Sequence, residues 1–177
     1  VNLNFLTVEF EIAVRRTQNV TSLGFDEVEF LISTNPGESL KPLAQVASGG
    51  ELSRIMLAIK TVLADSDDIP TLIFDEIDTG ISGRTAQKVA EKLAVISRNH
   101  QVICITHLPQ IASMADCHFE IKKSTDGEST KTRILRLNEK DTVTELARLL
   151  GGVQITEAVL QNASEMKKLA EQTKKRR

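Results

Sequence analysis

Apolar and polar residues alternate along the first part of the chain, a pattern typical of β-strands. Apolar side chains occupy every second position of segment 5–14: Leu6, Val8, Phe10, Ile12 and Val14. The alternation returns over 28–33, after the polar segment 17–26. We therefore expect an antiparallel hairpin with a long loop over 17–26. The turn sequence Asn35-Pro36-Gly37 predicts that the chain continues as loop to residue 46.

Apolar residues at helical spacing follow over 52–64. They recur three or four positions apart, at Leu52, Ile55, Met56, Ile59, Val62 and Leu63. Such spacing is typical of one face of an amphipathic helix. The apolar runs 71–74 and 102–105 do not alternate, which is typical of strands buried on both faces. Further helices are predicted over 84–98 and 108–115.

The pattern changes again in the last third of the chain. Two more strands and two more helices are predicted there, over 119–122, 132–137, 143–150 and 156–174. The strands flank an Asp126-Gly127 turn, and the first of the helices ends at Gly151-Gly152. The central order strand–helix–strand–helix predicts an α/β fold, mainly a parallel sheet with crossover helices, with the antiparallel hairpin near the N-terminus.

The composition fits one soluble domain. The chain has 177 residues, of which 41% are apolar and 26% charged, enough to bury a core. No apolar run reaches the roughly 18 residues of a membrane span. A start at Val1 without a signal segment suggests a fragment, or a processed chain, of a cytoplasmic protein. Cys104 and Cys117 form no C-x-x-C motif, so we expect two reduced thiols.

The charge is nearly balanced overall but uneven along the chain. The formal net charge is −2, which is not typical of a nucleic-acid-binding domain. The last four residues are all basic: Lys174, Lys175, Arg176 and Arg177. A solvated terminus explains them, and so does a basic arm near nucleic acid. Lys167 and Lys168 allow the same two interpretations.

A glycine-rich turn precedes the helix predicted over 52–64. Its residues are Ser48, Gly49, Gly50 and Glu51. Glycines let the backbone approach a ligand, and a helix start offers unpaired N–H groups with a positive dipole end. The turn therefore suits phosphate contact. The alternative is that Ser48 simply caps the helix.

Two carboxylates, Asp75 and Glu76, follow the apolar strand 71–74. Ligands of open α/β sheets bind at this end of the strands. An Asp there can hold Mg²⁺, which prefers oxygen ligands, and the adjacent Glu can polarise an attacking water. The alternative is a pair of solvated acids at a strand end.

A histidine, His107, follows the second apolar strand, 32 residues after Asp75. A crossover connection between parallel strands would bring it near Glu76. There it could contact a γ-phosphate or orient the water. His100 and His118 lack such a setting, so we interpret them as structural.

Together these segments resemble the motifs of the ABC-type ATPases. Residues 47–54 resemble the signature motif, 72–76 the Walker B strand with its catalytic Glu, and 105–107 the switch-histidine strand. More narrowly, segments 30–37, 74–83 and 106–110 resemble a bacterial family of SMC-related double-strand-break repair ATPases. The resemblance runs from about residue 25 to about residue 165.

The resemblance implies the C-terminal lobe of an ABC/SMC-type P-loop ATPase head. Residues 1–24 would form the coil junction and first strand, 25–165 the head lobe, and 166–177 a basic tail. The partner would be an N-terminal lobe of the same protein, joined through a coiled coil and carrying Walker A. This sequence lacks the Walker A pattern G-x-x-x-x-G-K-[ST], and no glycine in it is followed by Lys.

The same resemblance implies hydrolysis of ATP with Mg²⁺, coupled to DNA repair and recombination. Asp75 would bind the metal, Glu76 would orient the water, and His107 would sense the γ-phosphate. The turn 48–51 would contact nucleotide held by the other head of a homodimer. Ser82 stands where such heads usually carry an Asp that crosses to the partner, and Asp78 is an acid nearby.

Two alternatives share these motifs. One is the ATPase subunit of a transporter. The other is a non-catalytic module for dimerisation or DNA docking. On the half-site interpretation, the chain alone does not hydrolyse ATP.

Overall fold

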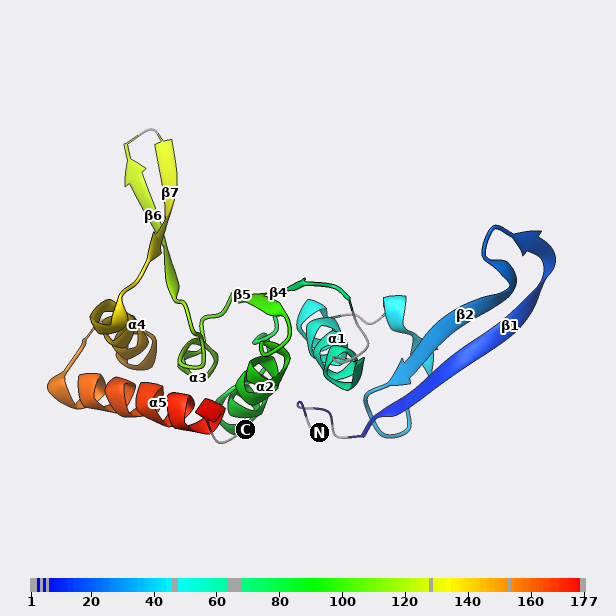
Figure 1. The fold of residues 1–177 in the computed structure, drawn as a ribbon, viewed down its shortest axis with the longest axis horizontal. Helices are drawn as coiled ribbons and strands as arrows, with labels where there is room; N and C mark the ends of the chain where they lie inside the picture. The colour runs from blue at the N-terminus through cyan, green and yellow to red at the C-terminus, as the bar shows by residue number, and fades with distance from the viewer. Residues whose placement is uncertain are drawn as a thin grey trace.

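The computed structural model describes residues 3, 5, 7–45, 48–63, 68–127, 129–152 and 154–175. The strands are β1 (Glu9–Thr21), β2 (Gly24–Ser33), β3 (Lys41–Pro42), β4 (Thr71–Phe74), β5 (Gln101–Cys104), β6 (Phe119–Asp126) and β7 (Ser129–Arg136). The helices are α1 (Gly49–Leu63), α2 (Gly83–Ile96), α3 (Pro109–Ala112), α4 (Glu139–Gly151) and α5 (Glu157–Lys175), with a 3₁₀ turn at Leu43–Gln45. They form an elongated body with the β1–β2 hairpin at one end and α4 and α5 at the other (Figure 1).

The first hairpin is longer than the sequence pattern predicts. The expected loop over 17–26 is wrong, because β1 continues to Thr21 and β2 begins at Gly24. The pairing shifts between Arg16 and Thr21, which marks a bulge. Thr17 Oγ1 donates to the carbonyl oxygen of Phe25 at 2.9 Å. Because a polar side chain such as Thr17 can bond to the backbone inside the hairpin, a polar sequence here does not require a loop.

One face of the β1–β2 hairpin is apolar. Cross-strand pairs place Phe10 opposite Ile32, and Ile12 opposite Phe30. The Phe10 and Phe30 rings stack with centroids 5.7 Å apart. Ile32 is buried, but both rings and Ile12 remain exposed, so the described chain covers only one end of this face.

The central sheet consists of β4 and β5, which pair in parallel with α2 as the crossover, as predicted. Leu72 and Phe74 are buried against the helices. The expectation that both strand faces are buried is wrong, because Ile73 is 69% exposed and its register partner Ile103 is 45% exposed. No described element covers this outer face of β4–β5.

The inner face of β4–β5 joins the main core. The core combines residues of α1, α2 and the segments that follow β4 and β5: Leu57, Leu72, Phe74, Ile77, Ile81, Ala86, Val89, Ala90, Leu93, Ile96, Ile111 and Met114. A smaller cluster lies between α3, α4 and α5: Ala112, Leu146, Ala147 and Ala163. Apolar burial on one side of the sheet therefore fixes the two strand ends that carry the motifs.

The helix predicted over 52–64 is confirmed over 52–63, but it begins earlier, at Gly49, so the residues expected in a preceding turn form its first turn. Its buried face also differs from the predicted one. The buried residues of α1 are Gly50, Arg54, Ile55 and Leu57. Val62, on the predicted face, is 84% exposed. Apolar residues lie on two sides of α1, and only one side meets the core, so spacing alone could not identify it.

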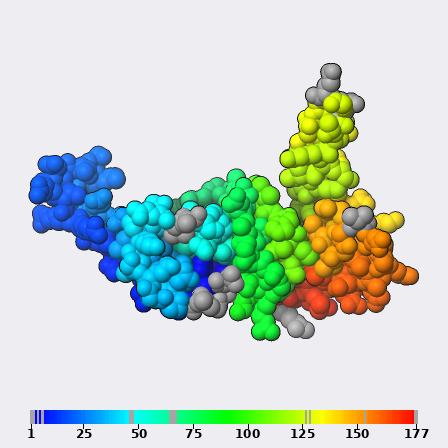
Figure 2. Space-filling view, turned by 180° about the vertical axis from the view of Figure 1, so that it is seen from behind, coloured from blue at the N-terminus to red at the C-terminus, as the bar shows by residue number. Residues whose placement is uncertain are grey.

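The second hairpin, β6–β7, is confirmed and extended. It projects away from the body in both views (Figures 1 and 2). Ile121 pairs with Ile134, and both are exposed. No helix among the described residues is long and apolar enough to cross a membrane.

Candidate active site

The three motifs meet at one edge of the central sheet. Asp75 and Glu76 directly follow β4, and residues 105–107 directly follow β5. The Ile105 N–H extends the parallel pairing by donating to the Phe74 carbonyl at 3.0 Å. The N-terminal turns of α1 lie against the residues that follow β4, through the contacts described next.

Two consecutive side chains of α1 bond to the backbone after β4. Ser53 Oγ donates to the Asp75 carbonyl at 2.7 Å. Arg54 Nη1 donates to the carbonyls of Ile77 and Thr79, at 3.3 Å and 2.8 Å. Arg54 is 3% exposed, and burial lowers the pKa of its guanidinium. The resulting bonds satisfy two carbonyls of the turn 76–80 with a buried cation.

The glycines of the 48–51 turn permit close packing within this chain. A Cβ atom at Gly50 would lie 2.8 Å from the Glu76 carbonyl oxygen and 2.9 Å from Thr79 Cβ. A Cβ atom at Gly49 would collide with the Glu76 carboxylate. Gly50 is buried whereas Gly49 is exposed. Close approach of the turn 76–80 is therefore one physical reason for these glycines.

Ser48 lies at the start of α1. Its carbonyl accepts from the Leu52 N–H at 3.0 Å, and its hydroxyl lies 3.5 Å from the Glu51 N–H. This is the position of a helix-capping residue, with a long side-chain contact. Ser48 therefore acts at least in part as a helix cap. Gly49 is exposed, so the start of α1 is accessible to a ligand.

The two carboxylates after β4 are both exposed. Asp75 Oδ1 accepts from the Glu76 N–H at 2.8 Å. Glu76 has a φ of 56°, the left-handed region that non-glycine residues rarely adopt. Strain of this kind is found at functional sites more often than elsewhere. The Glu76 carboxylate lies beside Gly49, at the start of α1.

One exposed carboxylate fits Mg²⁺ in a nucleotide site. No group of three or more His, Cys, Asp or Glu residues among those described is arranged to hold a metal ion. Mg²⁺ bound with a nucleotide needs only one or two protein carboxylates, because phosphates and waters complete its shell. Asp75 is therefore suited to a shared site and not to an all-protein one.

Asp78 is a site residue whose role the sequence left open. It is 4% exposed, and its Oδ2 atom accepts from Thr106 Oγ1 at 2.6 Å and from the His107 N–H at 2.8 Å. His107 Nδ1 lies 2.9 Å from the same oxygen. The sequence predicts that His107 lies near Glu76. The contacts that the structure describes join His107 to Asp78, which is two residues after Glu76 in the chain.

Three of the remaining candidates of the sequence, His100, Lys167 and Lys174, have structural partners. His100 Nδ1 lies 2.7 Å from the Ile69 carbonyl oxygen. Lys167 Nζ donates to the Ala115 carbonyl at 2.7 Å, and Lys174 Nζ pairs with Asp116. Ser82 precedes α2 in extended conformation and makes no side-chain capping bond. Arg176 and Arg177 lie outside the described residues, as does Ala47.

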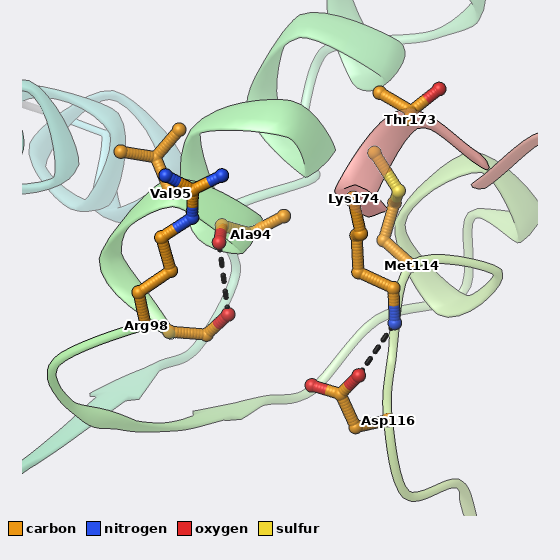
Figure 3. A pocket seen from close by; sticks show the side chains of 8 residues that line it. Ala94, Val95, Arg98, Met114, Asp116, Thr173 and Lys174 are labelled. Carbon is orange, nitrogen blue, oxygen red and sulfur yellow. Dashed lines mark hydrogen bonds and ion pairs between the residues drawn. The ribbon is translucent and has the colours of Figure 1, made fainter. Parts of the chain in front are cut away.

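Two hollows in the surface lie away from the motifs. A cavity of about 190 Å³ is lined by residues at the end of α2, by Met114 and Asp116, and by the end of α5 (Figure 3). A wider groove of about 740 Å³ runs beside the packed helices α4 and α5 and is also lined by Ala115, Asp116, His118, Leu137 and Asn138. Neither is lined by Asp75, Glu76 or residues 105–107.

Comparison with known proteins identifies relatives of this chain. No family model matches it. The DNA repair protein RecN of Bacillus subtilis is 50% identical over 155 residues, which cover 88% of this chain and 27% of that protein. RecN of Vibrio cholerae is 48% identical over 165 residues, covering 93% of this chain and 30% of that protein.

The fold also matches a solved structure. The Smc head domain of Pyrococcus yayanosii, solved with a coiled coil and joint, has a TM-score of 0.58 at 21% identity. The match covers 82% of this chain and 26% of that chain. The chain is therefore related in sequence to the RecN proteins, of which it spans less than a third, and its α/β fold is that of an ABC/SMC-type ATPase head, as predicted.

Proposed function

We propose that this chain is the C-terminal lobe of the head of an SMC-like ATPase that acts in DNA double-strand-break repair and recombination. The complete ATPase hydrolyses ATP to ADP and phosphate, in a cycle coupled to the engagement of two ATP-bound heads. The observation that carries the proposal is that Asp75, Glu76 and His107 lie at one sheet edge. There Ser53 of α1 donates to the Asp75 carbonyl. Identity near 50% with RecN proteins favours repair over the transporter alternative.

The missing part of the site is a second lobe that carries Walker A. The chain has no Walker A sequence, so it cannot itself cradle the nucleotide phosphates. The outer face of β4–β5, with Ile73, Ile103 and Ile105, is apolar and exposed. Exposed apolar faces of this kind mark interaction surfaces. The N-terminal lobe of the same protein would cover this face and bring the phosphate-binding loop to the sheet edge.

The residues of this chain have separate tasks in hydrolysis. Asp75 holds Mg²⁺, which neutralises charge on the phosphate oxygens when it is bound. Glu76 orients and polarises the attacking water. His107 contacts the γ-phosphate through the ring edge that faces away from Asp78. Each of these side chains is exposed, as contact with a bound nucleotide requires.

The 48–51 turn acts on nucleotide held by the other head of a homodimer. The exposed Gly49 and the helix start offer backbone N–H groups and a positive dipole end to phosphate oxygens. Ser48 and Glu51 flank these groups. The complete protein works in the cytoplasm at the nucleoid, with DNA as its partner.

The first test is ATP turnover. The 177-residue chain alone should show none above background, and mixing it with a Walker A lobe should restore it. Robust turnover by the chain alone would exclude the half-site model.

The second test is Glu76→Gln in the complete ATPase. Turnover should fall by about 10²- to 10⁴-fold, because the water loses its general base. ATP binding should persist and engaged dimers should accumulate, as size-exclusion chromatography with ATP would show. Asp116→Asn makes a matched acid-to-amide change at an exposed site away from the sheet edge and should leave turnover unchanged. Normal turnover by Glu76→Gln would remove Glu76 from its role.

A further inference from the structure

We propose that Asp78 is a positioning residue that fixes the His107 imidazole for contact with the γ-phosphate. This inference rests on the proposed function, since it presupposes that His107 takes part in ATP hydrolysis. Asp78 does not touch the nucleotide. It acts by holding the segment 106–107 in one geometry.

The contacts to Asp78 are concentrated on a single oxygen. Oδ2 lies 2.6 Å from Thr106 Oγ1, 2.8 Å from the His107 backbone nitrogen and 2.9 Å from His107 Nδ1. The carboxylate therefore binds the backbone and the ring of the same histidine. Together these contacts fix both where His107 sits and how its ring is turned.

The pairing also determines the protonated nitrogen of the ring. A carboxylate only accepts hydrogen bonds, so Nδ1 must carry a proton to bond with it. Nε2 then lies on the opposite ring edge. The His107 side chain is 72% exposed, whereas that of Asp78 is 5% exposed. One edge of the imidazole is thus held by the protein and the other is open to a ligand.

Asp78 is itself held in place from the other side. Arg54 donates to the carbonyls of Ile77 and Thr79, the two residues that flank Asp78. The Thr79 N–H donates to the Glu76 carbonyl at 3.0 Å, which closes the turn. The carboxylate is therefore preorganised before any ligand arrives, so its bonds to His107 require little further ordering.

The central experiment is a double-mutant cycle in the complete ATPase with Asp78→Asn and His107→Ala. The Asn side chain keeps the size of Asp78, but its neutral amide oxygen is a weaker acceptor than the carboxylate oxygen that it replaces. Asp78→Asn should lower kcat by about 10-fold or more, with the KM for ATP changed by less than about 3-fold. The double variant should be no slower than His107→Ala, because Asp78 acts through that ring.

The outcomes separate this inference from the proposed function. Normal kcat in Asp78→Asn, together with impaired His107→Ala, would overturn the positioning role alone. A double variant much slower than His107→Ala would also overturn it, because Asp78 would then act independently of the ring. Unchanged turnover in His107→Ala would overturn the assigned role of His107, and the positioning role with it. Asp116→Asn serves as the matched control and should turn over normally.

A measurement on the wild-type protein keeps the test independent of variant folding. Long-range ¹H–¹⁵N NMR of the His107 ring in the complete protein should show a proton on Nδ1. A ring protonated only on Nε2 would contradict the pairing. Thermal unfolding of Asp78→Asn then shows whether a lower kcat reflects positioning or loss of the fold.

Discussion

Burial shifts the pKa values of two ionisable side chains that lie outside the motifs. The Cys104 thiol ends β5, and burial raises its pKa to about 12, with smaller contributions from the charges of Asp78 and Asp75. His118 lies between α3 and β6, and burial lowers its pKa from the ordinary value of 6.5. Each shift has a consequence that can be measured on the protein in solution.

Thiol reactivity should distinguish the two cysteines. Thiolate is the reactive form, so the raised pKa of Cys104 and its partial burial should make it slow to react. Cys117 is exposed and should react rapidly at pH 8. A chromogenic disulfide reagent should therefore label about one thiol per folded chain and both after denaturation. Cys117→Ser should abolish the rapid phase; rapid labelling of that variant would contradict the burial of Cys104.

The stability of the fold should depend on the protonation of His118. Its Nδ1 is buried and has no hydrogen-bond partner in the described part of the chain. Because the folded-state pKa is lowered, the unfolded state binds the proton first as pH falls below about 6.5. The free energy of unfolding should therefore rise with pH through this window and level off above it. His118→Gln should flatten that slope in urea titrations between about pH 5.5 and pH 7.5, and an equal slope would refute the assignment.

Single residues were predictable where a motif set their position. Asp75, Glu76 and His107 follow apolar strands, and that placement alone puts them at the sheet edge. Arg54 and Asp78 carry no such signal, because nothing in the sequence distinguishes a buried charge from a solvated one. Only the tertiary contacts of the turn 76–80 show that both are buried and bonded.

At the scale of elements, α1 and the turn 76–80 form one packed unit. Gly50→Ala tests this packing, since the added Cβ would lie 2.8 Å from a backbone oxygen that cannot move freely. We expect a loss of about 1–3 kcal/mol in the free energy of unfolding. This would exceed the helix-propensity gain of roughly 0.5–1 kcal/mol.

Gly151→Ala is the control for Gly50→Ala. Its Cβ would lie 3.0 Å from a methyl group of Val159, a side chain that can shift. The expected effect in chemical denaturation is therefore smaller. A Gly50 variant as stable as the Gly151 variant would show that the turn 76–80 can move away from α1.

Periodicity predicted the positions of helices and strands more reliably than it predicted which face of each is buried. The parallel pair β4–β5 and the helices between and after it were all predicted from apolar spacing. The buried face of α1 was not, because its apolar residues lie on two sides. The polar composition of residues 17–26 predicts a loop, although β1 and β2 extend into this segment. Side-chain bonds such as that from Thr17 to Phe25 stabilise the strands there and leave no periodic signal in the sequence.

At the scale of the whole molecule, the exposed apolar surfaces agree with the proposal that a second lobe packs against this chain. The outer face of β4–β5 is one such surface, and the apolar face of the β1–β2 hairpin is another. An apolar sequence pattern is expected of residues that the proposed second lobe would bury. It cannot record whether the covering segment lies inside the chain, and this is why burial on both faces of β4 was predicted.

Ile73→Asp should therefore weaken association with the Walker A lobe and spare the fold of this chain. Ile73 is 69% exposed, so its replacement should change the free energy of unfolding by less than about 0.5 kcal/mol. Affinity for the second lobe, measured by calorimetry, should fall by about 10-fold or more. Val62→Asp makes the same kind of change on the exposed side of α1 and serves as the comparison. Equal affinity of the Ile73 variant and the wild type would place the second lobe elsewhere.

The bonding of the turn 76–80 also limits how the lobe can move. Arg54 ties the turn to α1, and Asp78 ties it to the residues after β5, so the three segments share one rigid frame. A ligand that displaces His107 would therefore also displace the start of α1, because the turn 76–80 is bonded to both. Motion in such a head would be concentrated at the boundary between lobes, and amide hydrogens of the turn 76–80 would exchange slowly in every nucleotide state.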